Sequence, residues 1–111
     1  MPTGDVSVAE ALALIDQGAL LLDVREQDEW DAGHAPQATL IPMSALNERA
    51  AELPRDRTIV CVCHVGGRSA MVTGALNQAG WTAVNLVGGM RAWQLAGQPV
   101  LDAAGQPGDA R

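Results

Sequence analysis

The stretch Ile59-Val60-Cys61-Val62-Cys63-His64-Val65-Gly66-Gly67-Arg68-Ser69 decides the fold of this chain. Its first part, residues 59–62, is a continuous apolar run of the length expected for a buried strand. The residues after it form a loop that begins with a cysteine and contains two consecutive glycines. Beyond Ser69, apolar residues recur at the i, i+3, i+4, i+7 spacing of one helix face, at Val72, Ala75, Leu76 and Ala79. The pattern predicts a strand, a loop starting at Cys63 and a helix starting at Ser69.

This arrangement favours an ionised sulfur at Cys63. The first N–H groups of a helix lack intrahelical partners, and the helix dipole adds partial positive charge there. Gly66 and Gly67 allow the loop amides to approach a bound atom closely. Arg68 adds a permanent positive charge with a planar set of donors. Such surroundings lower a thiol pKa from its free value of about 8.5, so we interpret Cys63 as a nucleophilic thiolate.

A less specific interpretation is that Cys63 is a small buried residue without chemistry. The glycines, Arg68 and the helix that follow favour the nucleophile, because their donors converge on one atom. Cys61 lies inside the strand and is predicted to belong to the core. A metal site built from Cys61, Cys63 and His64 lacks a further ligand pair, so we expect neither a metal nor a cofactor.

Composition narrows the class of protein. The chain has 111 residues, 48% of them hydrophobic and 18% charged, which fits one globular domain. A formal charge of −6 argues against nucleic-acid binding. No apolar run approaches the roughly 20 residues of a membrane span, and residues 1–5 do not resemble a secretory signal. With two cysteines that form no disulfide framework, we expect a cytoplasmic monomer.

Strands and helices alternate along the rest of the sequence, which predicts an α/β fold with a parallel sheet. A capping-box spacing, Ser7 with Glu10, opens the first helix. The acidic segment 26–34 is interpreted as a solvated helical turn with Trp30 as its core anchor. The domain is predicted to span 1–97, and the Gly-, Pro- and Ala-rich residues 98–111 to form a mostly disordered tail. Besides those described, the predicted helices are 7–17, 44–53 and 90–96, and the predicted strands are 20–24, 40–42 and 81–87.

Two charged residues end the strand at 20–24. Because parallel sheets bind ligands at the carboxyl ends of their strands, Asp23 and Arg25 are candidate supporting residues. We expect them to brace the loop or each other rather than to act in catalysis. His34 is expected to be a hydrogen-bonded structural histidine, and Gly88 with Gly89 to form a tight turn beside the loop.

By these features the chain resembles the rhodanese-like domain of the thiosulfate sulfurtransferase family in its single-domain form. The resemblance implies a three-layer α/β/α fold with a five-stranded parallel sheet. It implies that Cys63 accepts a sulfane sulfur and that loop amides hold it, with His64, Val65, Gly66, Gly67, Arg68 and Ser69 as substrate-binding residues. The motifs that carry it are 22–26, Gly33-His34-Ala35-Pro36, Ile41-Pro42, the loop 63–69, and Leu86-Val87-Gly88-Gly89-Met90-Arg91-Ala92-Trp93.

The resemblance leaves three functions to weigh. The first is a sulfurtransferase that moves sulfur from thiosulfate, a polysulfide or a protein persulfide to cyanide, a thiol or a partner protein. The second is a phosphatase or arsenate reductase, whose loops place five residues between cysteine and arginine, whereas four separate Cys63 from Arg68. The third is a non-enzymatic interaction or sulfur-carrier module. The retained Cys63 and the shorter loop favour sulfur transfer.

Overall fold

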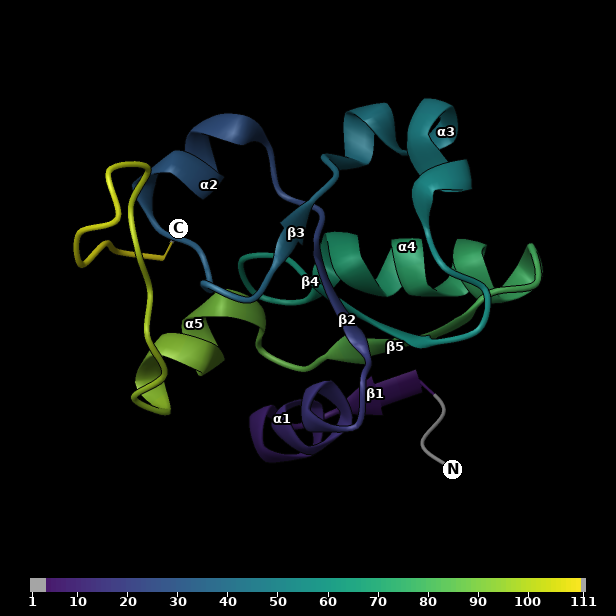
Figure 1. Cartoon of the computed structure of the whole chain (residues 1–111), viewed down its shortest axis with the longest axis horizontal. Coiled ribbons are helices and arrows are strands. Elements are labelled where there is room, and N and C mark those ends of the chain that lie inside the picture. The colour runs from purple at the N-terminus through teal and green to yellow at the C-terminus, as the bar shows by residue number, and fades with distance from the viewer. Residues whose placement is uncertain (1–3, 111) are drawn as a thin grey trace.

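The computed structural model describes residues 4–110 and has helices on both sides of one parallel sheet (Figure 1). Its strands are β1 (Gly4–Val6), β2 (Leu20–Asp23), β3 (Thr39–Leu40), β4 (Thr58–Val62) and β5 (Thr82–Leu86). Its α-helices are α1 (Val8–Asp16), α2 (Gln27–Ala32), α3 (Leu46–Arg49), α4 (Gly67–Gln78) and α5 (Gly89–Leu95). Two short 3₁₀ turns, η1 (Met43–Ala45) and η2 (Ala50–Glu52), flank α3.

The five strands follow the order β1-β5-β4-β2-β3, and every neighbouring pair is parallel. This confirms the predicted three-layer fold. β4 lies at the centre, paired with β2 on one side and β5 on the other. Cys63 therefore follows the middle strand, where the carboxyl ends of three strands and the loops after them converge, as open α/β sheets arrange their binding sites.

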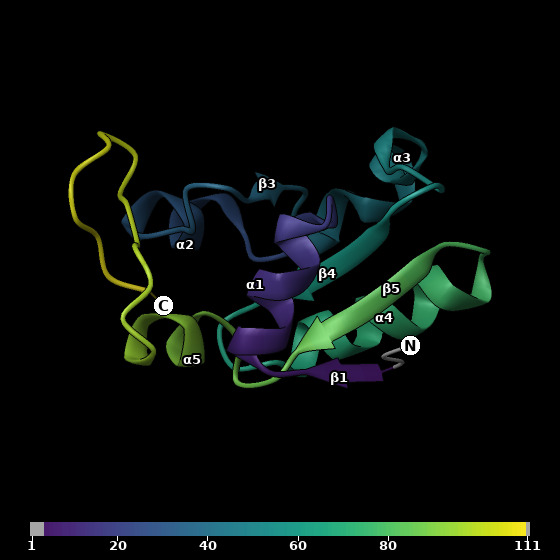
Figure 2. The ribbon, with the colours of Figure 1, turned by 60° about the horizontal axis from the view of Figure 1, so that its bottom comes forward.

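Alternation along the strands sends side chains to two separate cores. In β4, Val60 and Val62 belong to the cluster that includes α1 and α5, whereas Ile59 and Cys61 belong to the cluster under α3 and α4. Figure 2 shows α1 and α5 on the side of the sheet opposite α4. Strands buried on both faces need a continuous apolar run, which explains why 59–62 has no polar residue.

Some elements differ from the sequence-based prediction. β1 was not predicted, because three residues are too short to show a period. The helix after the loop begins at Gly67, two residues before Ser69. Its buried face is Ser69, Val72, Thr73 and Leu76, not the predicted set that included Ala75 and Ala79. The buried hydroxyls are tolerated because both form hydrogen bonds, Thr73 Oγ1 to the Ser69 carbonyl and Ser69 Oγ to Asn85.

The acidic segment also differs from its prediction at Trp30. This residue lies in α2 but is only half-buried, and its ring stacks on His34 with 3.8 Å between centroids. His34 Nδ1 donates to the Trp30 carbonyl at 3.0 Å, as expected for a structural histidine. The stack replaces the predicted core contact, because α2 lies beyond the end of the sheet rather than on one of its faces (Figure 1).

Residues 98–110 were predicted to be mostly disordered. In the structure they follow a defined path over α2 and α5 (Figure 1). Leu101 pairs with His34 through two backbone hydrogen bonds, of 2.8 and 2.9 Å, and Asp109 N donates to the Ala32 carbonyl. Trp93 Nε1 donates to the Pro99 carbonyl at 3.0 Å. Composition alone missed this order, since backbone hydrogen bonds, not apolar side chains, hold most of the segment.

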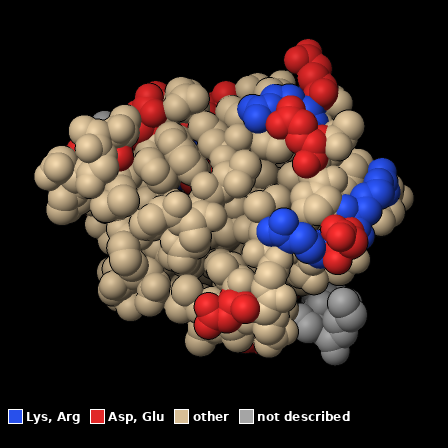
Figure 3. Space-filling model, viewed as in Figure 1, with Lys and Arg blue, Asp and Glu red and all other residues tan. Residues whose placement is uncertain are grey.

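Charged side chains on the face viewed in Figure 3 lie toward its periphery, around a broad uncharged area. Within residues 4–110, none of the helices combines the length and the apolar character that a bilayer crossing requires.

Candidate functional site

The candidate site is the loop between β4 and α4. Cys63 follows β4 directly and its side chain is 1% exposed. Gly66 has φ of 112°, a left-handed conformation that L side chains rarely adopt. It acts as the N-cap of α4, so the chain turns back over Cys63 and brings the first amides of the helix to the sulfur.

Backbone amides and one hydroxyl surround the sulfur of Cys63. The Gly66 amide donates to Sγ at 3.1 Å, and Ser69 Oγ lies 3.3 Å away. Burial raises the pKa of the Cys63 thiol, but the hydroxyl of Ser69 and the backbone amides of Ser69, Gly66 and Arg68 lower it by more. The net result is a pKa below the ordinary cysteine value. The structure thus places the amides of Gly66, Arg68 and Ser69 around the sulfur of Cys63.

Cys61 has the opposite character. It is fully buried in the core under α4, and burial raises the pKa of its thiol to about 11. Both cysteines are free thiols. The prediction that Cys61 is a core residue is confirmed.

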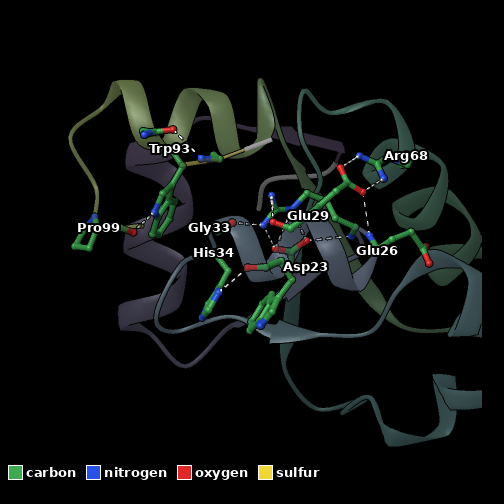
Figure 4. Close-up of polar contacts among 12 residues, drawn as sticks. Asp23, Glu26, Glu29, Gly33, His34, Arg68, Trp93 and Pro99 are labelled. Carbon is green, nitrogen blue, oxygen red and sulfur yellow. Dashed lines mark hydrogen bonds and ion pairs between the residues drawn. The ribbon is translucent and has the colours of Figure 1, made fainter. Parts of the chain in front are cut away.

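The Arg68 side chain does not point at the sulfur as the sequence suggested. Its backbone amide contributes to the thiolate cradle, but its guanidinium turns to α2. There Nη1 and Nη2 donate to the two carboxylate oxygens of Glu29 at 2.7 and 2.8 Å (Figure 4). The guanidinium therefore acts on Cys63 through its charge, which is partly balanced by Glu29.

Asp23 and Arg25 form a fully buried ion pair at the end of β2. Arg25 Nη2 donates to Asp23 Oδ2 at 2.8 Å, and both side chains are 0% exposed. Arg25 also donates to the Gly33 carbonyl at 2.8 Å, which ties β2 to the end of α2 (Figure 4). The geometry agrees with the bracing role expected for this pair, and it supports the helix that carries Glu29.

The Gly88-Gly89 turn packs directly behind the loop. Met90 N donates to the Cys63 carbonyl at 2.7 Å, and Arg91 N donates to the His64 carbonyl at 3.1 Å. A Cβ on Gly89 would collide with those same two carbonyl groups. The second glycine of the turn thus allows α5 to support the back of the site.

The remaining loop residues lie at its outer side. His64 is half-buried, Val65 is 57% exposed, and Gly67 is exposed at the start of α4. The Val65 side chain faces solvent.

Sequence reasoning missed two residues of the site. Asn85, in the middle of β5, accepts a hydrogen bond from Ser69 Oγ at 2.6 Å. A polar residue inside the apolar run 83–86 was a signal for it. Glu29 was assigned to a solvated turn, and no spacing in the sequence indicates that it reaches a residue 39 positions away.

A family model described as the rhodanese-like domain matches residues 7–96 of the chain. The curated proteins that it resembles include the "Probable adenylyltransferase/sulfurtransferase MoeZ" of Mycobacterium tuberculosis, 48% identical over 71% of the chain and 21% of MoeZ. The "HTH-type transcriptional regulator Rv0324" of the same species is 39% identical over 93% of the chain and 47% of the regulator. The chain thus spans between a fifth and a half of these relatives.

Among solved structures, a rhodanese-related protein from Thermoplasma volcanium superposes with a TM-score of 0.82 and 33% identity. The match covers 88% of this chain and 97% of that one. The similarity in structure therefore extends over nearly the whole of that solved chain.

Proposed function

Because this chain belongs to the rhodanese-like domain family, we propose that it is a sulfurtransferase that carries a sulfane sulfur as a persulfide on Cys63. The family supplies the class of chemistry, and a relative with 48% identity is named a sulfurtransferase. The sulfur donor is thiosulfate, a polysulfide or a protein persulfide. The acceptor is cyanide, a thiol or a partner protein.

The observation that carries this proposal is the convergence of donors on the Cys63 sulfur. The Gly66 amide at 3.1 Å and the Ser69 hydroxyl at 3.3 Å stabilise a negative charge on it. A thiolate is the nucleophilic form of cysteine. After transfer, the same amides can hold the negatively charged outer sulfur of a persulfide.

The chemistry is two nucleophilic substitutions at sulfur. With thiosulfate, the Cys63 thiolate attacks the sulfane sulfur, a new S–S bond forms, the S–S bond of thiosulfate breaks, and sulfite leaves with its electron pair. With cyanide as acceptor, carbon attacks the outer persulfide sulfur, thiocyanate leaves and the thiolate is restored. Neither step requires a proton from the protein or an external oxidant.

The geometry gives less support to phosphatase or arsenate reductase chemistry. Four residues separate Cys63 from Arg68, which suits a ring around one sulfur atom rather than a tetrahedral oxyanion. In addition, both terminal nitrogens of Arg68 donate to Glu29 and are not directed at the centre of the loop.

Intact-protein mass spectrometry tests the proposal. Incubation with thiosulfate should add about 32 Da, the mass of one sulfur, and the addition should disappear with cyanide or dithiothreitol. Cys63→Ser should never gain it, whereas Cys61→Ser should behave as wild type. An unchanged mass of the wild-type protein with thiosulfate, a polysulfide and a small-molecule persulfide would contradict the proposal.

A second candidate function is a sulfur carrier or interaction module within a larger protein. It is favoured by the relatives, in which the matched part makes up 21% of MoeZ and 47% of the regulator. A carrier should acquire the persulfide stoichiometrically but pass it only slowly to cyanide. Multiple turnovers with cyanide at the rate of persulfide formation would exclude the carrier role.

A further inference from the structure

We infer that Glu29 is a specificity-determining residue, which holds Arg68 away from doubly charged donors and so favours persulfide donors over thiosulfate. The inference rests on the proposed function and adds to it the class of sulfur donor. Its basis is the ion pair between α2 and the active loop (Figure 4).

The first observation is that this pair uses both ends of the guanidinium. Arg68 Nη1 and Nη2 each donate to a different Glu29 oxygen, at 2.7 and 2.8 Å, in the bidentate geometry that is strongest for this pair. The hydrogen bonds from Arg68 lower the pKa of Glu29 to about 2, although burial opposes this shift. The carboxylate is therefore charged and paired throughout the neutral range.

The second observation is that other contacts, from the N-terminus of α2 and from Arg25, hold Glu29 in place. The Glu26 amide donates to Glu29 Oε1 at 3.1 Å, which completes a capping box at the start of α2. Arg25 contacts the Glu29 carbonyl at 3.4 Å and secures the Gly33 carbonyl at the end of the helix. Glu29 cannot follow Arg68 toward the loop without disturbing these contacts.

The third observation concerns segment 98–110. Ala103 N donates to the Asp31 carbonyl and Asp109 N to the Ala32 carbonyl, both at 3.0 Å. The last turn of α2 is thus held from outside the rhodanese-like match, which ends at residue 96. Its own capping box, Arg25 and segment 98–110 therefore fix the helix that presents Glu29.

The Arg68–Glu29 ion pair makes direct binding of an anionic donor to Arg68 unfavourable. Thiosulfate carries two negative charges, and a direct contact with the Arg68 guanidinium requires that Arg68 leave Glu29. The carboxylate, in a side chain only 20% exposed, would then lose its partner beside the incoming dianion.

A thiol persulfide avoids this cost. It carries at most one negative charge near its sulfurs and transfers the outer sulfur while the proton leaves with the thiol product. The Cys63 thiolate attacks the outer sulfur, the donor S–S bond breaks and the thiol departs. Only the amide cradle needs to hold the transferred atom, and the Arg68–Glu29 pair stays intact.

The test compares two donors by quenched-flow mass spectrometry of persulfide formation, with thiosulfate and 2-hydroxyethyl hydropersulfide as probes. The measured quantity is the second-order rate constant for thiosulfate divided by that for the hydropersulfide. This ratio cancels any change in the thiolate fraction of Cys63, since both reactions use the same nucleophile. Glu29→Gln should raise the ratio about tenfold by releasing Arg68 for the dianion.

The matched control is Glu52→Gln. It removes one negative charge and breaks another arginine–glutamate ion pair, that with Arg49, far along the chain from the loop. Its donor ratio should stay within twofold of wild type. A similar rise in Glu52→Gln would assign the effect to net charge and overturn the inference.

A second variant separates the effect of the negative charge at position 29 from the effect of its ion pair with Arg68. Glu29→Asp keeps the charge on a shorter side chain and should give an intermediate ratio. If Glu29→Gln and Glu29→Asp both remain within twofold of wild type, Glu29 does not set donor preference, although sulfur transfer itself stands. If wild-type Cys63 gains sulfur from neither donor, the proposed function fails and the inference fails with it.

Discussion

The side-chain oxygen of Asn85 accepts a 2.6 Å hydrogen bond from the hydroxyl of Ser69. The same hydroxyl lies 3.3 Å from the sulfur of Cys63, and a hydroxyl has only one hydrogen to donate. Asn85, the Gly66 carbonyl at 3.3 Å and the Cys63 thiolate therefore compete for it. This competition gives the two polar residues opposite expected effects on the acidity of Cys63.

Ser69→Ala removes a donor that lowers the Cys63 pKa. A hydrogen bond to a charged group contributes about 1.5–3 kcal/mol, and one pKa unit corresponds to about 1.4 kcal/mol. We expect the Cys63 pKa to rise. Iodoacetamide alkylation rates measured against pH report it, and Cys61 does not interfere in the neutral range because burial raises the pKa of its thiol to about 11. An unchanged profile would show that the backbone amides suffice.

Asn85→Ala should act in the opposite direction. Without its shortest competing hydrogen bond, the Ser69 hydroxyl shares its hydrogen only between the sulfur and the Gly66 carbonyl, so the Cys63 pKa should fall below that of wild type. The same alkylation profile measures the change. The double variant Ser69→Ala/Asn85→Ala serves as the control, since it should match Ser69→Ala alone. A raised pKa in Asn85→Ala would mean that Asn85 positions the loop rather than competes for the hydrogen.

Gly89→Ala should destabilise the protein more than Gly97→Ala. Both glycines have positive φ, +57° and +80°, and an L side chain in that region costs about 1–2 kcal/mol. A Cβ at Gly97 meets no atom within 4 Å, whereas one at Gly89 collides with the Cys63 and His64 carbonyls. Overpacking of this kind adds about 1–3 kcal/mol. Urea unfolding of the two variants should reveal the difference, and equal losses would show that the loop yields easily.

Asp23→Asn should be among the more destabilising substitutions in the chain. It leaves the charge of Arg25 buried without its carboxylate, a change that costs about 3–5 kcal/mol in proteins. The control Glu52→Gln breaks an exposed pair and should cost far less, because solvent screens such pairs. Chemical denaturation measures both. A loss in Asp23→Asn no larger than that in Glu52→Gln would contradict the bracing role.

The pH dependence of stability should contain a contribution from Glu29. Its folded pKa, about 2, lies below the unfolded value of about 4.3. The stabilisation is therefore complete above roughly pH 5 and is lost as the pH falls toward 2. The Arg68 side chain is 37% exposed, so we expect only about 1 kcal/mol after screening.

Unfolding free energies of wild type and Glu29→Gln, measured between pH 7 and pH 2, check this expectation. The two curves should converge as the pH falls, because protonated Glu29 resembles the amide in charge. A constant difference across that range would mean that the ion pair does not contribute.

Much of the fold was predictable because it depends on local patterns. The apolar run 59–62, the glycines of the loop and the capping box at Ser7 each specify a local conformation. β1 was missed, since an edge strand of three residues carries too little pattern. The order of residues 98–110 was missed because backbone hydrogen bonds to α2 and α5 leave no composition signal.

The sequence by itself determined the sheet, the position of Cys63 at the end of its central strand and the glycine loop that surrounds the sulfur. The strands and the loop follow from patterns among residues close in the chain, and the alternation of strands with helices implies that the sheet is parallel. Only the tertiary structure decided that Glu29 pairs with Arg68, 39 positions away, and that Asn85 faces Ser69 from β5. The physical reason is that each is a single polar contact between separate elements, and one such contact leaves no periodic pattern in the sequence, unlike the burial of a whole helix or strand face.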